Sequence, residues 1–257
     1  MSAPPPFPRA RAALAAVAAL IGALALVGWI ADVPGLRSFG AAVDIKANGA
    51  ICMLLLAGAA LPVASRGARW AAGAAAAIAG GLALAVLVEY VADANLGIDQ
   101  LLFDDTAASH DPGRISAPGA VAFALLAIAL VLVAARRGWV VSQAAAVGTW
   151  AVAVASLVGE AYGSDGFLGI GTTNAMPPHQ AAAVIALAAS VVLAEPDRGI
   201  VGLARASGPG GRVVRYLVPA SIVVPFVVGL VLDRGVTLDR PVENAIFTLT
   251  AIVLAVT

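Results

Sequence analysis

The sequence is poor in the residue types from which catalytic and metal sites are usually built. Its 257 residues include one cysteine and two histidines, and charged residues make up 12%. A single cysteine cannot form an internal disulfide, and Cys52 lies inside an apolar run, where an inert buried thiol is expected. Walker A, GxSxG, HExxH and CxxC patterns do not occur. No enzyme active site and no cofactor are therefore predicted.

Charge is balanced as well as scarce. The formal net charge is zero, which gives no reason to expect a nucleic-acid partner. Hydrophobic residues, in contrast, make up 61% of the chain, and the mean hydropathy is +0.96. A soluble domain of this length does not need so much apolar surface. The lipid bilayer is therefore the expected partner.

Apolar runs close to membrane-spanning length recur along the chain. Such runs are expected to be helices, because in the bilayer core every backbone polar group must form its hydrogen bond internally. The runs are residues 13–30, 49–65, 70–88, 117–135, 139–159, 181–194, 216–232 and one that starts near residue 245. We predict an all-α integral membrane fold, a bundle of about eight transmembrane helices in residues 13–257 that follows a cytoplasmic tail, residues 1–12.

The distribution of charge predicts the orientation. With the N-terminus in the cytoplasm, ten of the fifteen Lys and Arg residues fall inside, as the positive-inside rule requires. The expected location is a bacterial inner membrane, with many spans and both termini cytoplasmic. A cleaved signal peptide is the alternative for the first run. The last run rises only about 20 Å before Thr257, less than a core of about 30 Å, so we expect a cut span with an output domain beyond it.

Similar short segments open the even-numbered runs. Residues 47–50 (ANGA) match residues 117–120 (APGA), and residues 178–181 (PHQA) and 243–245 (ENA) hold the same place before later runs. The simplest description is four tandem hairpins, each with a span, an outer loop and a second span. Transporters also use repeats of this kind.

The longest polar interval, residues 89–119, is expected to be an ordered outer loop where a stimulus is sensed. Glu89 and Asp93 share a helix face, and Glu160 is expected at matching depth. Acids near a membrane are functional candidates; hydration or pairing with Arg114 is the alternative. The histidines also suggest a metal or haem site, but without ligand spacing ordinary loop histidines are favoured. The candidates are Glu89, Tyr90, Asp93, Asp99, Gln100, His110, Arg114, Glu160, Tyr162 and His179.

Four short motifs resemble those of a known family. They are GIDQLLF at residues 97–103, PGRIS at 112–116, PDRG at 196–199 and GPGGR at 208–212. Together they are similar to the polytopic N-terminal membrane region of bacterial sensor histidine kinases, often followed by PAS domains, and of some diguanylate cyclases. The resemblance covers about residues 48–230. It implies a sensory input module, a homodimer formed through the output domain, and catalytic domains after the last span; the chain itself has no H-box, ATP-binding domain or GGDEF motif.

These features predict a signal-input domain that relays an envelope or membrane stimulus to a cytoplasmic output domain. The stimulus, a small molecule or a membrane state, is not identified by the resemblance. A small-solute transporter or channel, or a structural membrane subunit, are the alternatives. The scarcity of charged residues in the middle of the runs argues against transport.

Overall fold

All regular secondary structure in the described part of the chain is helical. The computed structural model describes residues 7–105, 111–161, 175–213 and 215–216, with residues 160–161 as backbone only. The helices are α1 (Pro8–Ile30), α2 (Pro34–Ser38), α3 (Ala47–Ala60), α4 (Arg66–Ala92), α5 (Ala117–Ala135), α6 (Trp139–Ala161), α7 (Pro178–Val192) and α8 (Gly199–Arg205). The described residues contain no strand, so the predicted all-α fold is confirmed for them. Because α1 begins at Pro8, part of the expected N-terminal tail is helical.

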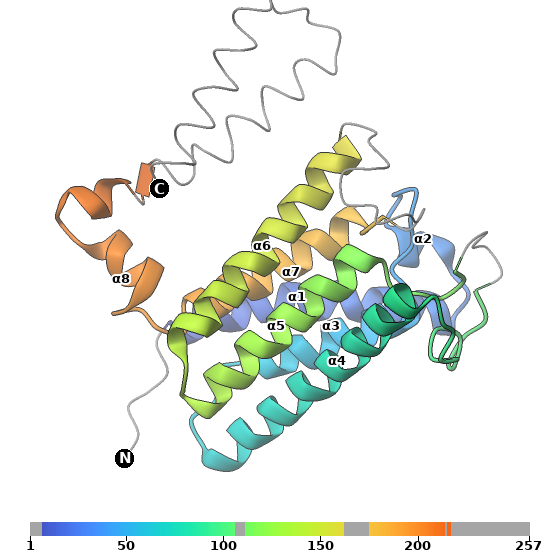
Figure 1. Cartoon of the computed structure of the whole chain (residues 1–257), viewed down its shortest axis with the longest axis horizontal. Helices are drawn as coiled ribbons and strands as arrows, with labels where there is room; N and C mark the ends of the chain where they lie inside the picture. Colours follow the sequence, from blue (N-terminus) through green and yellow to red (C-terminus); the bar gives the residue numbers. More distant parts are fainter. Residues whose placement is uncertain (1–6, 106–110, 162–174, 214, 217–257) are drawn as a thin grey trace, which may run out of the picture.

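Six helices form the bundle, and α3, α5 and α7 lie at its centre (Figure 1). α1 packs against α3, α4 against α5, and α6 against α7, and α3, α5 and α7 also contact one another. These three central helices begin at Ala47, Ala117 and Pro178, the positions at which the sequence repeats align. The repeated segments therefore mark the starts of helices that meet inside the bundle.

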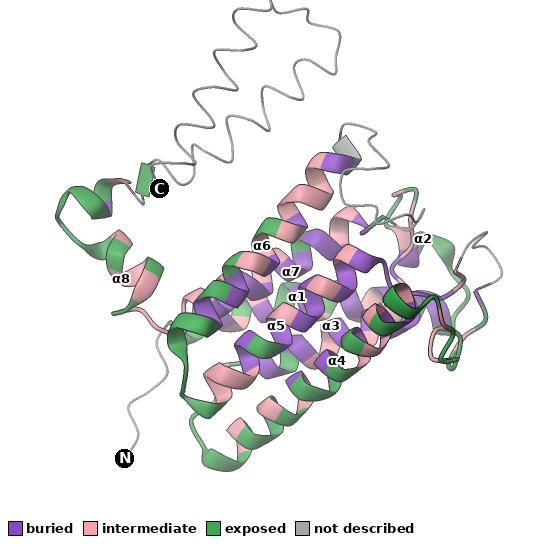
Figure 2. Ribbon diagram, in the orientation of Figure 1, coloured by how far each residue is buried: buried purple, intermediate pink, exposed green. Residues whose placement is uncertain are grey.

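The outer faces of the helices are apolar rather than polar. Buried residues lie where the helices face one another, and exposed residues cover the outside (Figure 2). The exposed large hydrophobic residues include Leu20, Trp70, Ile78, Leu84, Val88, Ile128 and Val147. Exposed apolar surface that continues around a helix bundle is what a lipid environment favours. The surface therefore agrees with a membrane location.

Four of the described helices are long and apolar enough to cross a membrane, namely α1, α4, α5 and residues 139–159 of α6. The prediction of eight spans is wrong in this respect. α3 and α7 have only 14 and 15 residues, which rise about 21–23 Å. A proline explains each limit: Pro62 follows the end of α3 and Pro178 is the first residue of α7. The last two expected runs lie outside the described residues.

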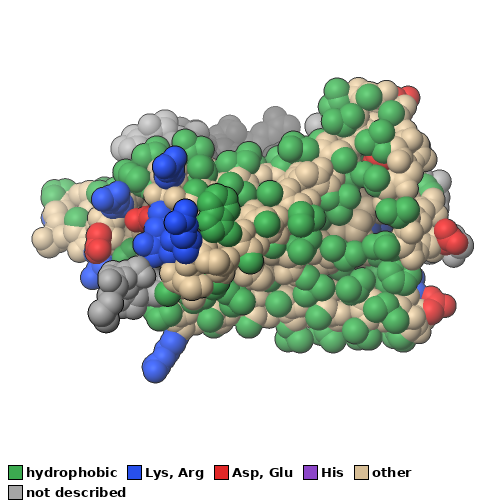
Figure 3. Space-filling model, turned by 90° about the horizontal axis from the view of Figure 1, so that it is seen from below, with side chains coloured by type: hydrophobic (Ala, Val, Ile, Leu, Met, Phe, Trp, Pro, Cys, Tyr) green, Lys and Arg blue, Asp and Glu red, His purple; other side chains and the backbone are tan. Residues whose placement is uncertain are grey.

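The two ends of the bundle carry opposite charge. We call the end with residues 31–46 and 93–116 the acidic end, and the end with residues 61–65, 136–138 and 193–198 the basic end. In Figure 3, Lys and Arg side chains gather at one end with a few Asp and Glu side chains among them, further Asp and Glu side chains lie at the other end, and hydrophobic side chains cover the surface between. The described part is therefore a multi-pass helical membrane bundle with a polar layer at each end.

Small side chains allow the close packing that fixes these ends. A Cβ atom added to Gly80 of α4 would lie 2.8 Å from the Cβ of Ala127 in α5, too close for any larger residue without a shift. Small residues at helix contacts are how membrane helices approach each other. Ser116 then caps α5, because its hydroxyl accepts a hydrogen bond from the Gly119 N–H at 3.2 Å. The chain just before Ser116 is thus held at a defined place.

Candidate functional site at the acidic end

The two connections at the acidic end form one polar layer. Lys46, the sole lysine of the chain, places its Nζ 2.6 Å from Oδ2 of Asp105. The same oxygen accepts a hydrogen bond from the Gly113 N–H at 3.1 Å. The rings of Trp29 and Phe103 lie 5.9 Å apart, and the Trp29 indole donates to the Ile45 carbonyl at 2.8 Å. Residues 93–116 are therefore anchored to residues 31–46.

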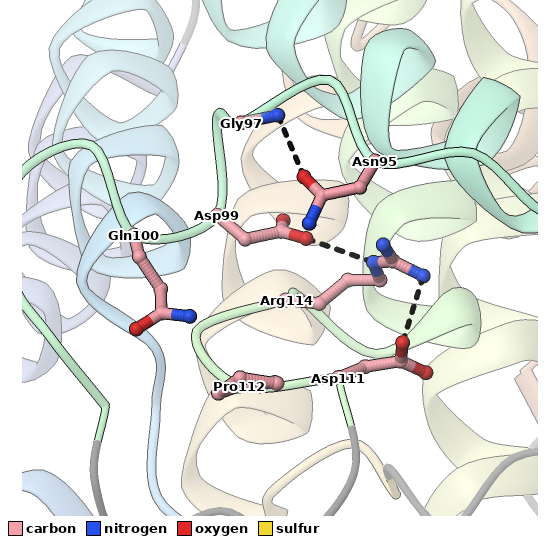
Figure 4. Close-up of a pocket in the computed structure, with 7 residues that line it drawn as sticks. All are labelled: Asn95, Gly97, Asp99, Gln100, Asp111, Pro112 and Arg114. Carbon is pink, nitrogen blue, oxygen red and sulfur yellow. Dashed lines mark hydrogen bonds and ion pairs between the residues drawn. The ribbon is translucent and has the colours of Figure 1, made fainter.

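Arg114 lies at the centre of this layer (Figure 4). Its side chain is 10% exposed and faces three carboxylates. Nε lies 2.8 Å from Oδ2 of Asp99 and 3.7 Å from Oε2 of Glu89, and Nη1 lies 3.0 Å from Oδ1 of Asp111. Nη2 donates to the Ala94 carbonyl at 3.3 Å. The pairing with Arg114, which the sequence suggests as the alternative to a functional role of these acids, is thus present for Glu89, and Asp99 and Asp111 pair with Arg114 as well. We call these four charged residues the Arg114 cluster.

Helix α4 supplies the buried wall of the cluster. Glu89, in the last turn of α4, is fully buried, and its Oε1 accepts a hydrogen bond from the Leu96 N–H at 2.6 Å. Tyr90 follows it, with its ring 5.3 Å from the Arg114 guanidinium. The Tyr90 hydroxyl donates to the Ile115 carbonyl at 3.0 Å. The end of α4 is therefore joined to the residues that lead into α5.

Two carboxylates of the cluster each have a buried oxygen that receives no hydrogen bond. Oε2 of Glu89 and Oδ1 of Asp99 are buried without a hydrogen-bond partner. Burial raises the pKa of Asp99 to about 6; the hydrogen bond with Arg114 opposes the rise and the nearby Glu89 adds to it. Burial lowers the pKa of Arg114, but Asp99 and the other carboxylates outweigh burial and raise it above its usual value. A proton on Asp99 would therefore supply a hydrogen-bond donor within the cluster.

A pocket of about 360 Å³ opens beside the cluster. It is lined by Asn95, Gly97, Asp99, Gln100, Asp111, Pro112 and Arg114 (Figure 4). The carboxamide of Asn95 stabilises the turn, since its Oδ1 accepts a hydrogen bond from the Gly97 N–H at 2.7 Å. The lining combines amide donors, carboxylate acceptors and a guanidinium. Such a pocket suits a small polar molecule that competes for the partners of Arg114.

The sequence candidates divide into three groups. Glu89, Tyr90, Asp99 and Arg114 are brought together, and Gln100 lines the adjoining pocket. Asp93 and His179 lie elsewhere: Asp93 is the exposed left-handed cap of α4, with φ 47°, and His179 stacks on Phe39 at 4.8 Å. His110, Tyr162 and the side chain of Glu160 are outside the described residues.

Sequence reasoning missed several members of the site. Asp111 and Asn95 were not among the candidates, although Asp111 precedes Arg114 by three residues, a spacing that brings side chains together in a turn. The Lys46–Asp105 pair joins residues 59 positions apart, for which spacing offers no signal. Backbone partners such as the Ala94 carbonyl are likewise invisible in the sequence.

Neither a metal site nor a relative identifies the chemistry. Among the described residues, no group of three or more His, Cys, Asp or Glu side chains is placed to hold a metal ion. Comparisons with protein-family models, with curated proteins and with solved structures found no match to this chain. The interpretation of function therefore rests on the geometry and charge of the molecule itself.

Proposed function

We propose that the chain is a membrane-embedded signal-input domain of a bacterial signal-transduction protein. A stimulus at the acidic end, outside the inner membrane, would be relayed to an output domain at the basic, cytoplasmic end. The output domain would be a histidine kinase or a diguanylate cyclase, and it would form the homodimer. The resemblance of the outer and inner motifs to such input regions supports this choice of output.

The observation that carries the proposal is the Arg114 cluster. Glu89 lies in the last turn of α4, and Arg114 lies two residues before Ser116, the cap of α5. A proton or a small molecule that changes the partners of Arg114 therefore changes the connection between two long helices. A stimulus of this kind can shift a bundle between two packings if it binds one of them better.

Transport is the weaker alternative. A translocation site is expected near the middle of the membrane, where charged residues mark it. In the described parts of α1, α4, α5 and α6, charged residues occur only within four residues of a helix end. The polar side chains of Ser142 and Thr149 in α6 instead bond to the carbonyls of Ala129 and Ala145, at 3.1 and 2.9 Å. The Ser142 hydroxyl thus joins α6 to α5, and the Thr149 hydroxyl bonds within α6.

The first experiment is to read the coding sequence past the codon for Thr257. The resemblance to sensor input regions predicts a PAS, kinase or GGDEF domain there. A stop codon soon after a finished span would contradict the proposal and would direct attention to transport assays.

The second experiment tests the cluster in the full-length protein. In membrane vesicles, Glu89→Gln is expected to change autophosphorylation or cyclic dinucleotide synthesis several-fold over a range of external pH. Asp93→Asn is the matched control, because Asp93 lies one turn away and is exposed. Equal output from Glu89→Gln, Asp93→Asn and the unmodified protein at every pH would exclude the cluster as the sensing element.

A further inference from the structure

The basic end contains a second pocket, of about 390 Å³, that the proposed sensing role does not use. Three arginines from three helices line it: Arg11 in the first turn of α1, Arg69 in the first turn of α4, and Arg136 at the end of α5. Glu195 and Asp197, in the segment after α7, line it as well. Figure 3 shows the gathering of Lys and Arg side chains at one end of the molecule.

Arg11 is the unusual member of this pocket. Its residue exposure is only 4%, and its Nη2 donates to the Ala60 carbonyl, at the end of α3, at 3.3 Å. Its Nε is buried and has no hydrogen-bond partner. A buried N–H of a charged group that lacks an acceptor is costly, and natural proteins usually satisfy it with a side chain, water or ligand. The pocket therefore lies beside a guanidinium whose hydrogen-bond donors are only partly used.

The carboxylates of the pocket do not fill that role. Asp197 forms an exposed ion pair with Arg205, Nη1 to Oδ1 at 3.3 Å. Within the described residues, neither Arg11 nor Arg136 forms an ion pair within 4.0 Å with any acid, Glu195 included. Arg69 donates only to the Ala64 carbonyl, at 2.8 Å. Three arginines and two carboxylates thus line one pocket, and Glu195 acts electrostatically on Arg11 without a direct ion pair.

We infer that this pocket binds a phosphate oxyanion, presented by an anionic lipid headgroup or as free phosphate. Planar guanidinium groups match the oxygens of a phosphate and bind it through paired hydrogen bonds. The arginines stand within the first or last turn of membrane helices, at the depth of lipid headgroups. Basic pockets between such helices are suited to phospholipid headgroups. The inference is independent of what the acidic end senses.

The test uses the full chain in an uncharged detergent, titrated with dihexanoyl phosphatidylglycerol or with inorganic phosphate at ionic strength matched with sodium chloride. Native mass spectrometry and thermal unfolding report binding. Arg136→Gln is the test variant, because the Arg136 side chain is exposed and has no hydrogen bond to a described residue. Arg137→Gln is the matched control, since Arg137 is adjacent and exposed but does not line the pocket.

The expected result is saturable binding that Arg136→Gln weakens about tenfold, the effect of losing one charged hydrogen bond, and that Arg137→Gln leaves unchanged. Binding of phosphatidylglycerol alone would identify a lipid headgroup as the source, and binding of inorganic phosphate would identify the free ion. Absence of saturable binding in both arms would overturn the inference. Equal weakening in the two variants would also overturn it, because it would indicate diffuse surface attraction.

Discussion

Each end of the bundle has a nearly buried arginine beside a pocket, but the two arginines differ in their hydrogen-bond and ion-pair partners. At the acidic end, Arg114 faces three carboxylates, one carbonyl and one aromatic ring. At the basic end, Arg11 has one carbonyl and an unpaired Nε. Beside Arg114 the atoms without hydrogen-bond partners are carboxylate oxygens of Glu89 and Asp99, whereas at the basic end the atom is the Nε of Arg11 itself. The Arg114 cluster thus has buried acceptors without donors, and the Arg11 side chain has a buried donor without an acceptor.

The difference follows from how the acids are distributed along the chain. Of the acidic residues near Arg114, Asp99 and Asp111 lie in the connection between α4 and α5, and Glu89 lies in the last turn of α4 just before it. The acids of the basic end are few, and Asp197 is committed to Arg205. A ligand is thus optional at the acidic end, where the protein supplies the counter-charges, and more strongly required at the basic end. The following predictions test this contrast.

The largest effect is expected from removing Arg114. Arg114→Gln leaves the fully buried Glu89 and the nearby Asp99 without their cation, and breaking a buried pair in this way costs about 3–5 kcal/mol. Arg11→Gln removes one of the two donors of the Ala60 carbonyl, which keeps the Ser190 hydroxyl at 3.5 Å, so the cost is at most about 1 kcal/mol. Denaturant unfolding in detergent, followed by circular dichroism, measures both. Equal losses in the two variants would show that the contrast between the ends is wrong.

The sequence predicted one side of this contrast better than the other. Apolar runs located the bundle helices, and the polar interval located Glu89, Tyr90, Asp99 and Arg114, because clustered polar residues between apolar runs are visible in a sequence. Asp99 and Arg114 are 15 residues apart, however, and only the fold of the loop brings them to 2.8 Å. The spacing of these residues in the sequence therefore does not decide whether the acids pair with Arg114 or have a separate functional role.

The basic end was understood least from the sequence. In the sequence, Arg11 indicates only the orientation of the first span, and it falls within the expected N-terminal tail. The reason is that a positive charge before an apolar run usually marks the start of a membrane span. In the structure Arg11 lies inside α1, buried against the end of α3. The length of α3 was overestimated, because the apolar run continues to residue 65 but the helix stops at Ala60. For α7 the predicted run, residues 181–194, is shifted along the chain: the helix begins at Pro178 and ends at Val192.

The second prediction concerns pH and applies to the acidic end alone. The pKa of Asp99, about 6, lies above its usual 3.8, so folding favours the protonated form. The resulting stabilisation is complete below about 3.8 and is lost as the pH rises through about 6. A shift of this size corresponds to at most about 3 kcal/mol. The unmodified protein should therefore lose stability across this window.

Asp99→Asn should remove most of that dependence, because the carboxamide cannot titrate. Asp93→Asn, at the exposed end of α4, should keep it. Unfolding curves at several pH values between the two limits provide the measurement. A pH dependence in Asp99→Asn as large as in the unmodified protein would assign the titration to another group.

The smallest of these effects tests whether the Arg114 cluster depends on the backbone of its loop. Gly113 has φ 75°, and a Cβ there would lie 2.4 Å from the Asp99 carbonyl oxygen. Gly113→Ala therefore adds a backbone clash to the strain of a left-handed residue, for about 2 kcal/mol in total. The N–H of Gly113 also donates to Asp105, so a shift at this position would disturb the anchor to Lys46.

Gly97 provides the matched control within the same loop. Its φ is 74°, but nothing lies within 4 Å of a Cβ added there. Gly97→Ala should cost only the strain of the left-handed conformation, about 1 kcal/mol. The difference between the two variants in unfolding free energy isolates the close approach of Gly113 to Asp99. If the two losses are equal, that approach does not hold the carboxylate against Arg114, and the preformed character of the acidic end must come from the ion pairs alone.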